Sequence, residues 1–259
     1  MTARAVVVPL SDSQSADTAH FLPGVDGGLR PACTFADLVR GRLAVHGVML
    51  TGPGRPADHG VERHARLALD EVVRKTGRGP DRLIGYSYGA LVAVEMAHQA
   101  KARGLPAPRL LVLDTPIAPG PQSAPSPVTM FWYIGRGAGL DLTLAQFAAL
   151  DPERRAAEVA RWCATRSPGF DLNAARTVYA TVEANCAAWA GHEARPYLGP
   201  ADVVVAEESA ETSGDRADWT AMFPGGYRVR TVPGGHLDVL SEAGAPALAR
   251  AVSDLTALD

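Results

Sequence analysis

One serine in the chain lies in a pattern that supports nucleophilic catalysis. Ser87 is the centre of Gly85-Tyr86-Ser87-Tyr88-Gly89, which fits G-x-S-x-G. In this pattern the serine occupies a sharp turn from a strand into a helix, and the flanking glycines let the two elements approach closely. The residues around the motif therefore decide whether Ser87 is a nucleophile or an idle serine in a glycine-rich turn.

The segments on either side of Ser87 favour the catalytic interpretation. The run Asp81-Arg-Leu-Ile84 can form a short buried strand. Residues 90–102 are mostly good helix formers with apolar side chains at helical spacing, and Gly104 supplies a stop. The amides at the start of such a helix point to where negative charge develops during acyl transfer.

A carboxylate stands at the end of the next predicted strand. Residues 109–113 are almost wholly apolar and predict a buried central strand, which Asp114 follows directly. Catalytic groups of open parallel sheets gather beyond the carboxyl ends of the strands, so we expect Asp114 near Ser87. A carboxylate there can orient a histidine and stabilise its charged form. The alternative is a turn or capping aspartate before Thr115 and Pro116.

His236 is the candidate base. It ends Pro233-Gly-Gly-His236, directly after a predicted last strand at 227–232, and completes the chain order serine, acid, histidine of α/β-hydrolases. Asp238 is expected to be a capping or surface group. The remaining histidines lack this setting and are predicted to be structural or exposed: His20, His46, His59, His64, His98 and His192.

A glycine-rich loop is the candidate oxyanion hole. Pro23-Gly-Val-Asp-Gly-Gly28 follows a predicted strand at 19–22. In α/β-hydrolases a loop at this place gives one oxyanion-hole amide, and the residue after the nucleophile gives the other. The donors here would be the backbone amides of Val25 and Tyr88. A simple tight turn is the alternative.

The order of predicted elements indicates an α/β fold. Strand and helix alternate through the first half, which is typical of a mostly parallel sheet with helices on both faces. Pro9 places the first strand at an edge. The predicted strands are 5–10, 19–22, 47–50, 81–84, 109–113, 201–206 and 227–232, and the predicted helices in this framework are 34–43, 61–76, 90–102 and 243–258.

The alternation breaks down at residues 118–198, which we interpret as an inserted helical lid within a single domain, 1–259. A proline-rich connector at 119–127 precedes helical patterns at 143–166, interrupted near 151–152, and at 173–191. The insertion is the most aromatic part of the chain. Phe131, Trp132 and Tyr133, together with Tyr86, are predicted to line a chamber for an acyl chain, with the lid's own core as the alternative for the lid aromatics.

Composition excludes several other classes of protein. The chain has 259 residues and a net charge of -3, without a basic stripe for nucleic acid. Three scattered cysteines predict neither a disulfide framework nor a metal site. The apolar runs are too short for a signal peptide or a membrane span, so we expect a cytoplasmic protein that binds neither nucleic acid nor membrane.

These segments together resemble the thioesterase domains of polyketide synthases and non-ribosomal peptide synthetases, in the α/β-hydrolase superfamily. The resemblance covers nearly the whole chain except the lid. Ala90 replaces a glycine common in the family, a change without expected effect on the chemistry. The segments that carry the resemblance are Val6–Leu10, Phe21–Gly28, Gly85–Ala97, Leu111–Asp114, Trp219 and Val232–His236.

The resemblance implies a serine thioesterase without a cofactor. Ser87, deprotonated by His236, would attack the thioester of an acyl chain on the phosphopantetheine arm of an acyl or peptidyl carrier protein, with Asp114 as the acid. Hydrolysis would release a free acid, whereas an internal nucleophile would close a macrocycle. Oligomeric state is not predicted, and both an excised terminal domain and a free-standing enzyme fit the chain's start at Met1.

Three alternatives stay open. In many α/β-hydrolases, including stand-alone editing thioesterases, the acid follows the next strand, which here means Glu207, Glu208 or Asp215. A general carboxylesterase acting on small oxygen esters would need no docking surface for a carrier protein. A non-catalytic relative that only binds an acyl ligand or a partner would have altered catalytic positions, and Ser87, Asp114 and His236 are intact.

Overall fold

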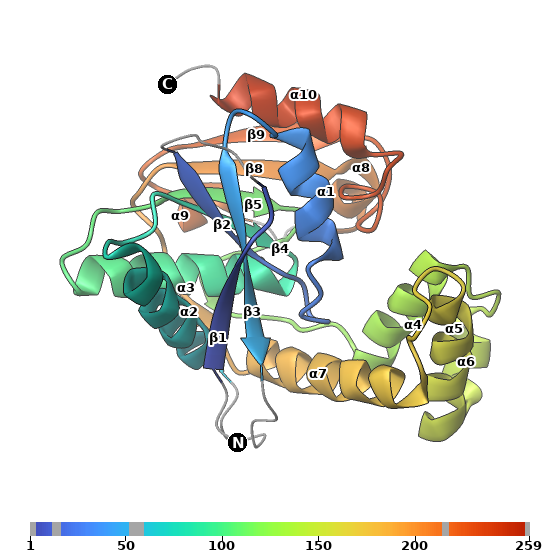
Figure 1. The fold of residues 1–259 in the computed structure, drawn as a ribbon. Coiled ribbons are helices and arrows are strands. Elements are labelled where there is room, and N and C mark those ends of the chain that lie inside the picture. Colours follow the sequence, from blue (N-terminus) through green and yellow to red (C-terminus); the bar gives the residue numbers. More distant parts are fainter. Residues whose placement is uncertain (1–3, 12–16, 52–59, 214–217, 257–259) are drawn as a thin grey trace.

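The computed structural model describes residues 4–11, 17–51, 60–213 and 218–256. In this part of the chain, seven strands form one sheet in the order β1-β3-β2-β4-β5-β8-β9 (Figure 1). β1 is antiparallel to β3 at one edge, and the other neighbouring strands are parallel, so the predicted mostly parallel sheet is confirmed. The strands are β1 (Arg4–Pro9), β2 (Thr18–Leu22), β3 (Ala44–Thr51), β4 (Arg82–Tyr86), β5 (Arg109–Leu113), β8 (Ala201–Ala206) and β9 (Tyr227–Val232).

Helices cover both faces of the sheet, as predicted. Successive strand residues point to opposite faces, so Leu83 of β4 joins the cluster under α2 and α3, while Ile84 joins the cluster under α1 and α10. Val112 and Leu113 of β5 divide in the same way. These helices are α1 (Arg30–Leu38), α2 (Val61–Thr76), α3 (Tyr88–Ala102) and α10 (Ala245–Thr256).

The predicted boundaries are correct for α2 but not for α1. α2 has the predicted bounds, but α1 runs over Arg30–Leu38 instead of 34–43. Pro31 lies in the first turn of α1, where its missing N–H costs nothing because first-turn amides have no intrahelical acceptor. After α1 the chain turns at Gly41, whose φ of +80° suits glycine.

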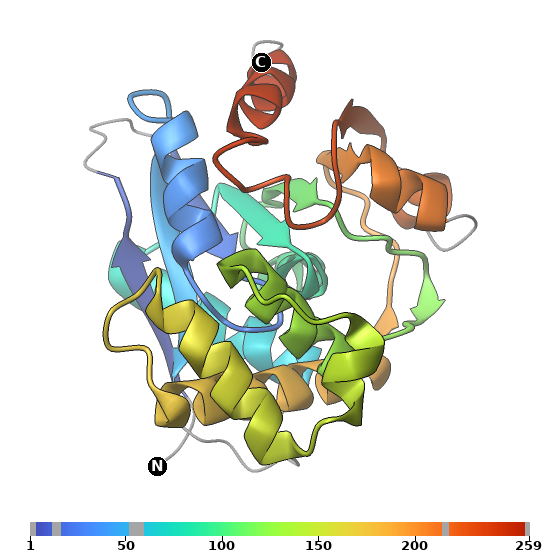
Figure 2. The same ribbon diagram turned by 90° about the vertical axis from the view of Figure 1, so that its right-hand side faces the viewer.

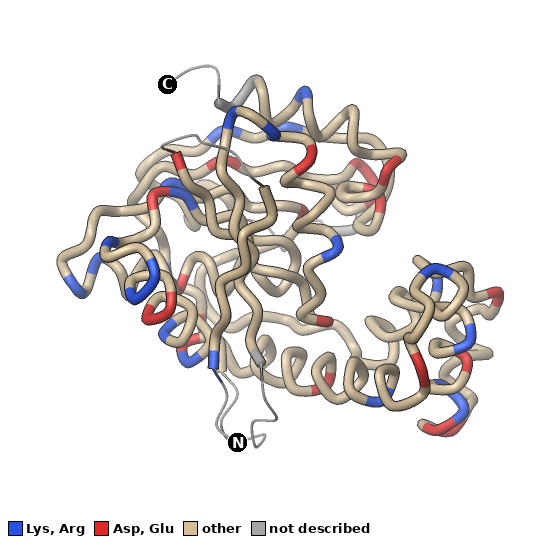
Figure 3. The backbone as a smooth tube through the Cα atoms, in the orientation of Figure 1, with Lys and Arg blue, Asp and Glu red and all other residues tan. Residues whose placement is uncertain are grey.

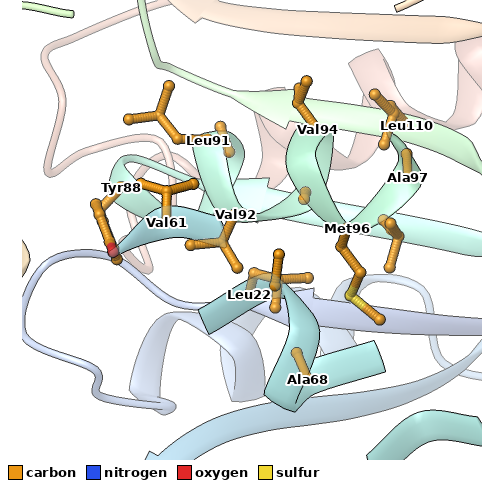
Figure 4. Close-up of a cluster of buried hydrophobic side chains, with 14 of the residues drawn as sticks. Leu22, Val61, Ala68, Tyr88, Leu91, Val92, Val94, Met96, Ala97 and Leu110 are labelled. Atoms are coloured by element: carbon orange, nitrogen blue, oxygen red, sulfur yellow. The ribbon is translucent and has the colours of Figure 1, made fainter. Parts of the chain in front are cut away.

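The packing of α3 against α2 holds the start of α3 in place. Leu91 and Met96 of α3 are fully buried, and Ala68 of α2 lets the two helices approach (Figure 4). Leu22, at the end of β2, belongs to the same cluster. Truncating a large buried side chain of this kind to alanine typically costs about 2–5 kcal/mol. The helix that follows Ser87 is therefore a rigid part of the core.

The insertion is helical, as predicted, but contains a helix that the sequence reading missed. α4 occupies the aromatic run that we predicted only as chamber lining. The break predicted near 151–152 separates α5 from α6, where Asp151 accepts a hydrogen bond from the Arg154 amide. β6 (Gly120–Pro121) and β7 (Glu193–Ala194) pair at the base of the insertion. Its helices are α4 (Pro127–Ala138), α5 (Leu144–Ala149), α6 (Pro152–Ala164) and α7 (Leu172–Ala190).

The lid has a hydrophobic core of its own. Phe131, Phe147 and Val159 are fully buried in a cluster separate from those of the sheet. α7 connects the two parts, running from the sheet region to α4 and α6 (Figures 1 and 2). The lid lies on the same side of the sheet as α8 (Glu207–Ser213), which follows β8; the short α9 (Trp219–Met222) precedes β9.

Charged residues of both signs are interspersed along the outer helices of both parts (Figure 3). No helix among the described residues is long and apolar enough to cross a membrane.

Candidate active site

Ser87 lies in the strained turn between β4 and α3. Its backbone has φ 54° and ψ −128°, a conformation that non-glycine residues rarely adopt. A Cβ on Gly85 would clash with the backbone at Gly89 and Ala90, and a Cβ on Gly89 would clash with the Leu22 carbonyl. Both glycines of the motif are therefore needed for the close approach of strand and helix.

The loop after β5 is tied to the Ser87 turn. The Ser87 amide donates to the Leu113 carbonyl at 3.3 Å. Thr115 Oγ1 donates to the Ser87 carbonyl at 3.0 Å, so the two turns hold each other. Asp114, between Leu113 and Thr115, also has positive φ, 49°. Backbone strain at two neighbouring strand ends marks this edge of the sheet as the candidate site.

The carboxylate of Asp114 is buried and accepts three hydrogen bonds. Oδ1 accepts from the Ala206 amide at 2.7 Å. Oδ2 accepts from Ser209 Oγ at 2.8 Å and lies 2.7 Å from His236 Nδ1. Because an ionised carboxylate only accepts hydrogen bonds, Nδ1 of His236 carries the hydrogen of this bond. Nε2 is then the ring nitrogen that can accept a proton.

The loop after β9 places His236 against Tyr86. The two rings stack with centroids 4.9 Å apart, and the Tyr86 hydroxyl donates to the His236 carbonyl at 2.9 Å. Burial raises the pKa of Tyr86, so its hydroxyl stays protonated as a donor. Asp238 accepts from the Gly235 amide at 2.9 Å, a hydrogen bond within the loop after β9 and not a helix cap.

Tyr86 thus occupies a different place from the one predicted. We expected it to line a substrate chamber, but its side chain is only 7% exposed and packs beneath His236 in the core. Its position at the end of β4, one residue before the turn, directs it into the sheet's own cluster. The structure makes Tyr86 a support for His236.

One alternative acid, Glu208, lies beside the loop of His236, where its Oε2 would be 2.6 Å from a Cβ on Gly235. Glu207 and Glu208 begin α8, and the amide of Glu208 donates to the Gly234 carbonyl at 3.1 Å. Asp215 lies outside the described residues. The same helix supplies Ser209 to Asp114, a residue that the sequence reading did not single out. Its only signal in the sequence is its place in the first turn after a strand end.

The predicted oxyanion loop lies over Ser87. Gly27 N donates to Gly24 O at 3.0 Å and closes a four-residue turn. A Cβ on Gly24 would lie 3.5 Å from the Ser87 Cβ, so the loop and the serine are in direct proximity. Asn185 of α7, also missed in the sequence, donates to the Val25 carbonyl at 2.7 Å.

Tyr88 opens α3 on the other side of Ser87. The first amides of an α-helix have no intrahelical acceptor, which leaves the Tyr88 N–H available to an external one. Its side chain is buried, and its hydroxyl pairs with His64 Nδ1 at 2.8 Å. Tyr88 thus follows Ser87 directly, and Val25 follows Gly24, the loop residue that lies against Ser87.

The aromatic residues predicted to line a chamber have separate surroundings. Phe131 is fully buried between Phe147 and Tyr179, so the lid-core alternative holds for it and the lining prediction was wrong. Trp132 is partly buried and donates from Nε1 to the Leu142 carbonyl at 2.7 Å. Tyr133 is 38% exposed, and its contact with substrate stays a prediction.

Metal chemistry has no candidate site in the part of the chain that the structure describes. No group of three or more His, Cys, Asp or Glu side chains there is arranged to hold a metal ion.

A family model matches part of this chain, and solved structures share its fold. A family model described as the thioesterase domain matches residues 33–127, which include Ser87 and Asp114. No curated protein matches the sequence. The resemblance to thioesterase domains deduced from the motifs is confirmed by this match and by the solved structures below.

Solved thioesterase structures share the fold over nearly the whole chain. The Vlm2 thioesterase domain is 18% identical with a TM-score of 0.69, covering 98% of this chain and 99% of that one. RedJ, a thioesterase of the prodiginine pathway in Streptomyces coelicolor, is 19% identical with a TM-score of 0.65, covering 95% and 94%. At these identities the structures establish the α/β-hydrolase fold of thioesterase domains.

A much longer protein contains the same fold. A four-domain nonribosomal peptide synthetase, solved with AMP and glycine, is 17% identical with a TM-score of 0.82. The match covers 98% of this chain but only 20% of the synthetase. The chain thus spans about a fifth of the length of that synthetase.

Proposed function

We propose that this protein is a serine thioesterase that releases a polyketide or peptide chain from the phosphopantetheine arm of an acyl or peptidyl carrier protein. The observation that carries the proposal is the 2.7 Å contact between Asp114 Oδ2 and His236 Nδ1, at the sheet edge where Ser87 occupies its strained turn. The thioesterase family match over residues 33–127 supports the substrate class.

The reaction proceeds through an acyl-enzyme. Nε2 of His236 takes the proton of the Ser87 hydroxyl as Oγ attacks the thioester carbon. The tetrahedral intermediate collapses, the carbon–sulfur bond breaks, and His236 returns the proton to the departing pantetheine thiolate. Water or an internal hydroxyl or amine of the chain then attacks the acyl-serine, again with His236 as base. The products are a free acid or a ring, and Ser87 is regenerated.

Asp114 orients and stabilises His236 in both halves of the reaction. Its carboxylate is held by the Ala206 amide and the Ser209 hydroxyl as well as by the imidazole. A carboxylate fixed in this way keeps Nδ1 protonated, leaves Nε2 free to act as base, and stabilises the imidazolium that forms.

The oxyanion of each tetrahedral intermediate would be bound by the amides of Val25 and Tyr88. The turn containing Val25 lies over Ser87, and Tyr88 begins the helix whose positive end faces the same place. In comparable enzymes one such donor contributes about 3 kcal/mol to transition-state stabilisation.

Matched substrates test the proposed class. Acyl-pantetheine thioesters and oxygen esters of the same acyl chains are compared as substrates of the wild-type protein and of Ser87→Ala. We expect Ser87-dependent cleavage of thioesters, with the product distinguishing hydrolysis from ring closure. Efficient cleavage of the oxygen esters without any cleavage of the thioesters would indicate a general carboxylesterase in place of the proposed thioesterase.

A further inference from the structure

The lid helix α7 places a polar side chain against the sheet core. Asn185 is only 6% exposed, and Val182, Cys186 and Trp189 near it belong to the apolar cluster that contains α3. A buried amide is costly unless it is hydrogen-bonded. Asn185 Nδ2 donates to the Val25 carbonyl at 2.7 Å, so its partner lies in the loop over Ser87.

This hydrogen bond holds the middle of the loop's turn. The bond from Gly27 N to Gly24 O encloses the Val25–Asp26 peptide. Among the described residues, the non-glycine residues with positive φ are Ser87 and Asp114, so Asp26 lacks the positive φ that a type II turn needs. The central peptide has opposite orientations in type I and type II turns. Asn185 therefore holds the carbonyl of this peptide, whose orientation is not that of a type II turn.

The face of α7 that carries Asn185 also reaches Tyr88. The Trp189 ring, one turn after Asn185, lies 6.1 Å from the Tyr88 ring, centroid to centroid. One turn before Asn185, Thr181 Cγ2 would be 3.7 Å from a Cβ on Gly27. Residues four apart lie on one face of a helix. One face of α7 thus contacts both residues proposed to provide oxyanion donors.

The other end of α7 belongs to the lid. It packs on α4 and α6, and Ala175 lies in the lid's own hydrophobic cluster. The helix runs without interruption from Leu172 to Ala190. Contacts in the lid and contacts at the oxyanion loop are therefore made by one continuous element.

We infer that Asn185 is a positioning residue for the oxyanion hole, through which α7 ties the lid to the catalytic loop. The inference rests on the proposed function. Asn185 acts through Val25 and does not contact the reacting atoms. Because the oxyanion exists only in the transition states and tetrahedral intermediates, a misplaced donor lowers kcat and leaves KM nearly unchanged.

Kinetics of two variants test this role against a matched control. Asn185→Asp keeps the shape but cannot donate from its carboxylate, and Asn185→Leu removes the polar group. Both should lower kcat about tenfold, less than the loss of a whole oxyanion donor, with KM within about twofold. Val182→Ala, on the same face of α7, changes core packing without removing this bond and should keep kcat within about twofold.

Hydrogen–deuterium exchange of the peptide covering residues 22–29 gives a readout independent of activity. Faster exchange in the Asn185 variants than in Val182→Ala, together with the kcat loss, supports the inference. Unchanged exchange, or faster exchange with unchanged kcat, would overturn it. If the wild type shows no Ser87-dependent thioester turnover, the proposed function fails, and exchange alone decides whether Asn185 holds the turn.

Discussion

Ser209 Oγ lies 2.8 Å from Asp114 Oδ2, the same carboxylate oxygen that lies 2.7 Å from His236 Nδ1. Ser209 comes from α8, a helix that begins directly after β8, so a separate element of the fold holds the carboxylate. In many related folds the acid itself stands after this strand. Here that region supplies a hydroxyl donor to the carboxylate of Asp114, at the end of β5.

We predict that Ser209→Ala lowers kcat about threefold to tenfold. This loss, about 0.7–1.4 kcal/mol, is below the roughly 1.5–3 kcal/mol of a hydrogen bond to a charged group because the Ala206 amide still holds Asp114. Ser209→Thr keeps the hydroxyl and should retain most of the activity. Steady-state kinetics at fixed pH measure both variants, and equal losses in the two would show that packing, not the hydrogen bond, matters at this position.

Replacing the proposed catalytic acid, Asp114, should lower kcat far more than replacing Ser209. Asp114→Asn should reduce kcat by about 10⁴-fold with the fold intact, because an amide cannot hold the imidazole in the required tautomer or stabilise its charge. Glu207→Gln should reduce kcat by less than about threefold. Circular dichroism checks folding of both variants. The reverse ranking would move the acid to the region after β8.

Two histidines in the sheet predict a pH-dependent stability. His20 of β2 is 1% exposed, lies with its ring centroid 5.4 Å from that of His46 on β3, and has no hydrogen-bond partner for either ring nitrogen among the described residues. Burial, and then the neighbouring His46, lower the pKa of His20 from 6.5 to about 4. The folded state therefore favours the neutral ring.

The sign of the effect follows from this shift. Above pH 6.5 both states hold His20 neutral; as pH falls toward 4, the unfolded chain binds a proton that the folded protein does not. Folding should lose up to about 3 kcal/mol over this interval. Urea unfolding of wild type and His20→Phe at pH 7 and pH 4.5 measures it. If the free energy of unfolding of His20→Phe falls between pH 7 and pH 4.5 as much as that of the wild type, the prediction is contradicted.

Gly89 and Gly137 differ in the space that an added Cβ would meet. Gly89→Ala should destabilise the fold by several kcal/mol or prevent it, because the new Cβ would clash with the Leu22 carbonyl. Gly137→Ala, in α4 with no atom within 4 Å of the new Cβ, should stabilise by about 0.5–1 kcal/mol. Thermal unfolding compares the two, and a mild effect at Gly89 would show that the turn tolerates a side chain.

The sheet and the positions of Ser87, Asp114 and His236 could be predicted because each depends on local sequence. A strand end, a glycine pattern and a helix start are encoded within a few residues, and parallel strands bring their carboxyl ends to one edge. Asn185 could not be found in this way, since its partner Val25 is 160 residues away in sequence. Only the packing of α7 brings the two together.

The lid was predicted less well for a related reason. α4 begins at Pro127 and contains Gly135 and Gly137, residues that weaken a helical pattern, yet tertiary packing keeps the segment helical. The same packing buries Phe131 among lid aromatics, where we had expected a chamber wall. An aromatic run shows that side chains will be buried but not which neighbours will bury them.

The central claim is a covalent acyl intermediate on Ser87, and intact-protein mass spectrometry tests it most directly. The protein is mixed with an acyl-pantetheine thioester, quenched within seconds, and then digested to locate the modification. We predict a mass increase corresponding to one acyl group, on the peptide that contains Ser87 and absent from Ser87→Ala. Thioester turnover that persists in Ser87→Ala, or an acyl group located on another residue, would contradict the account.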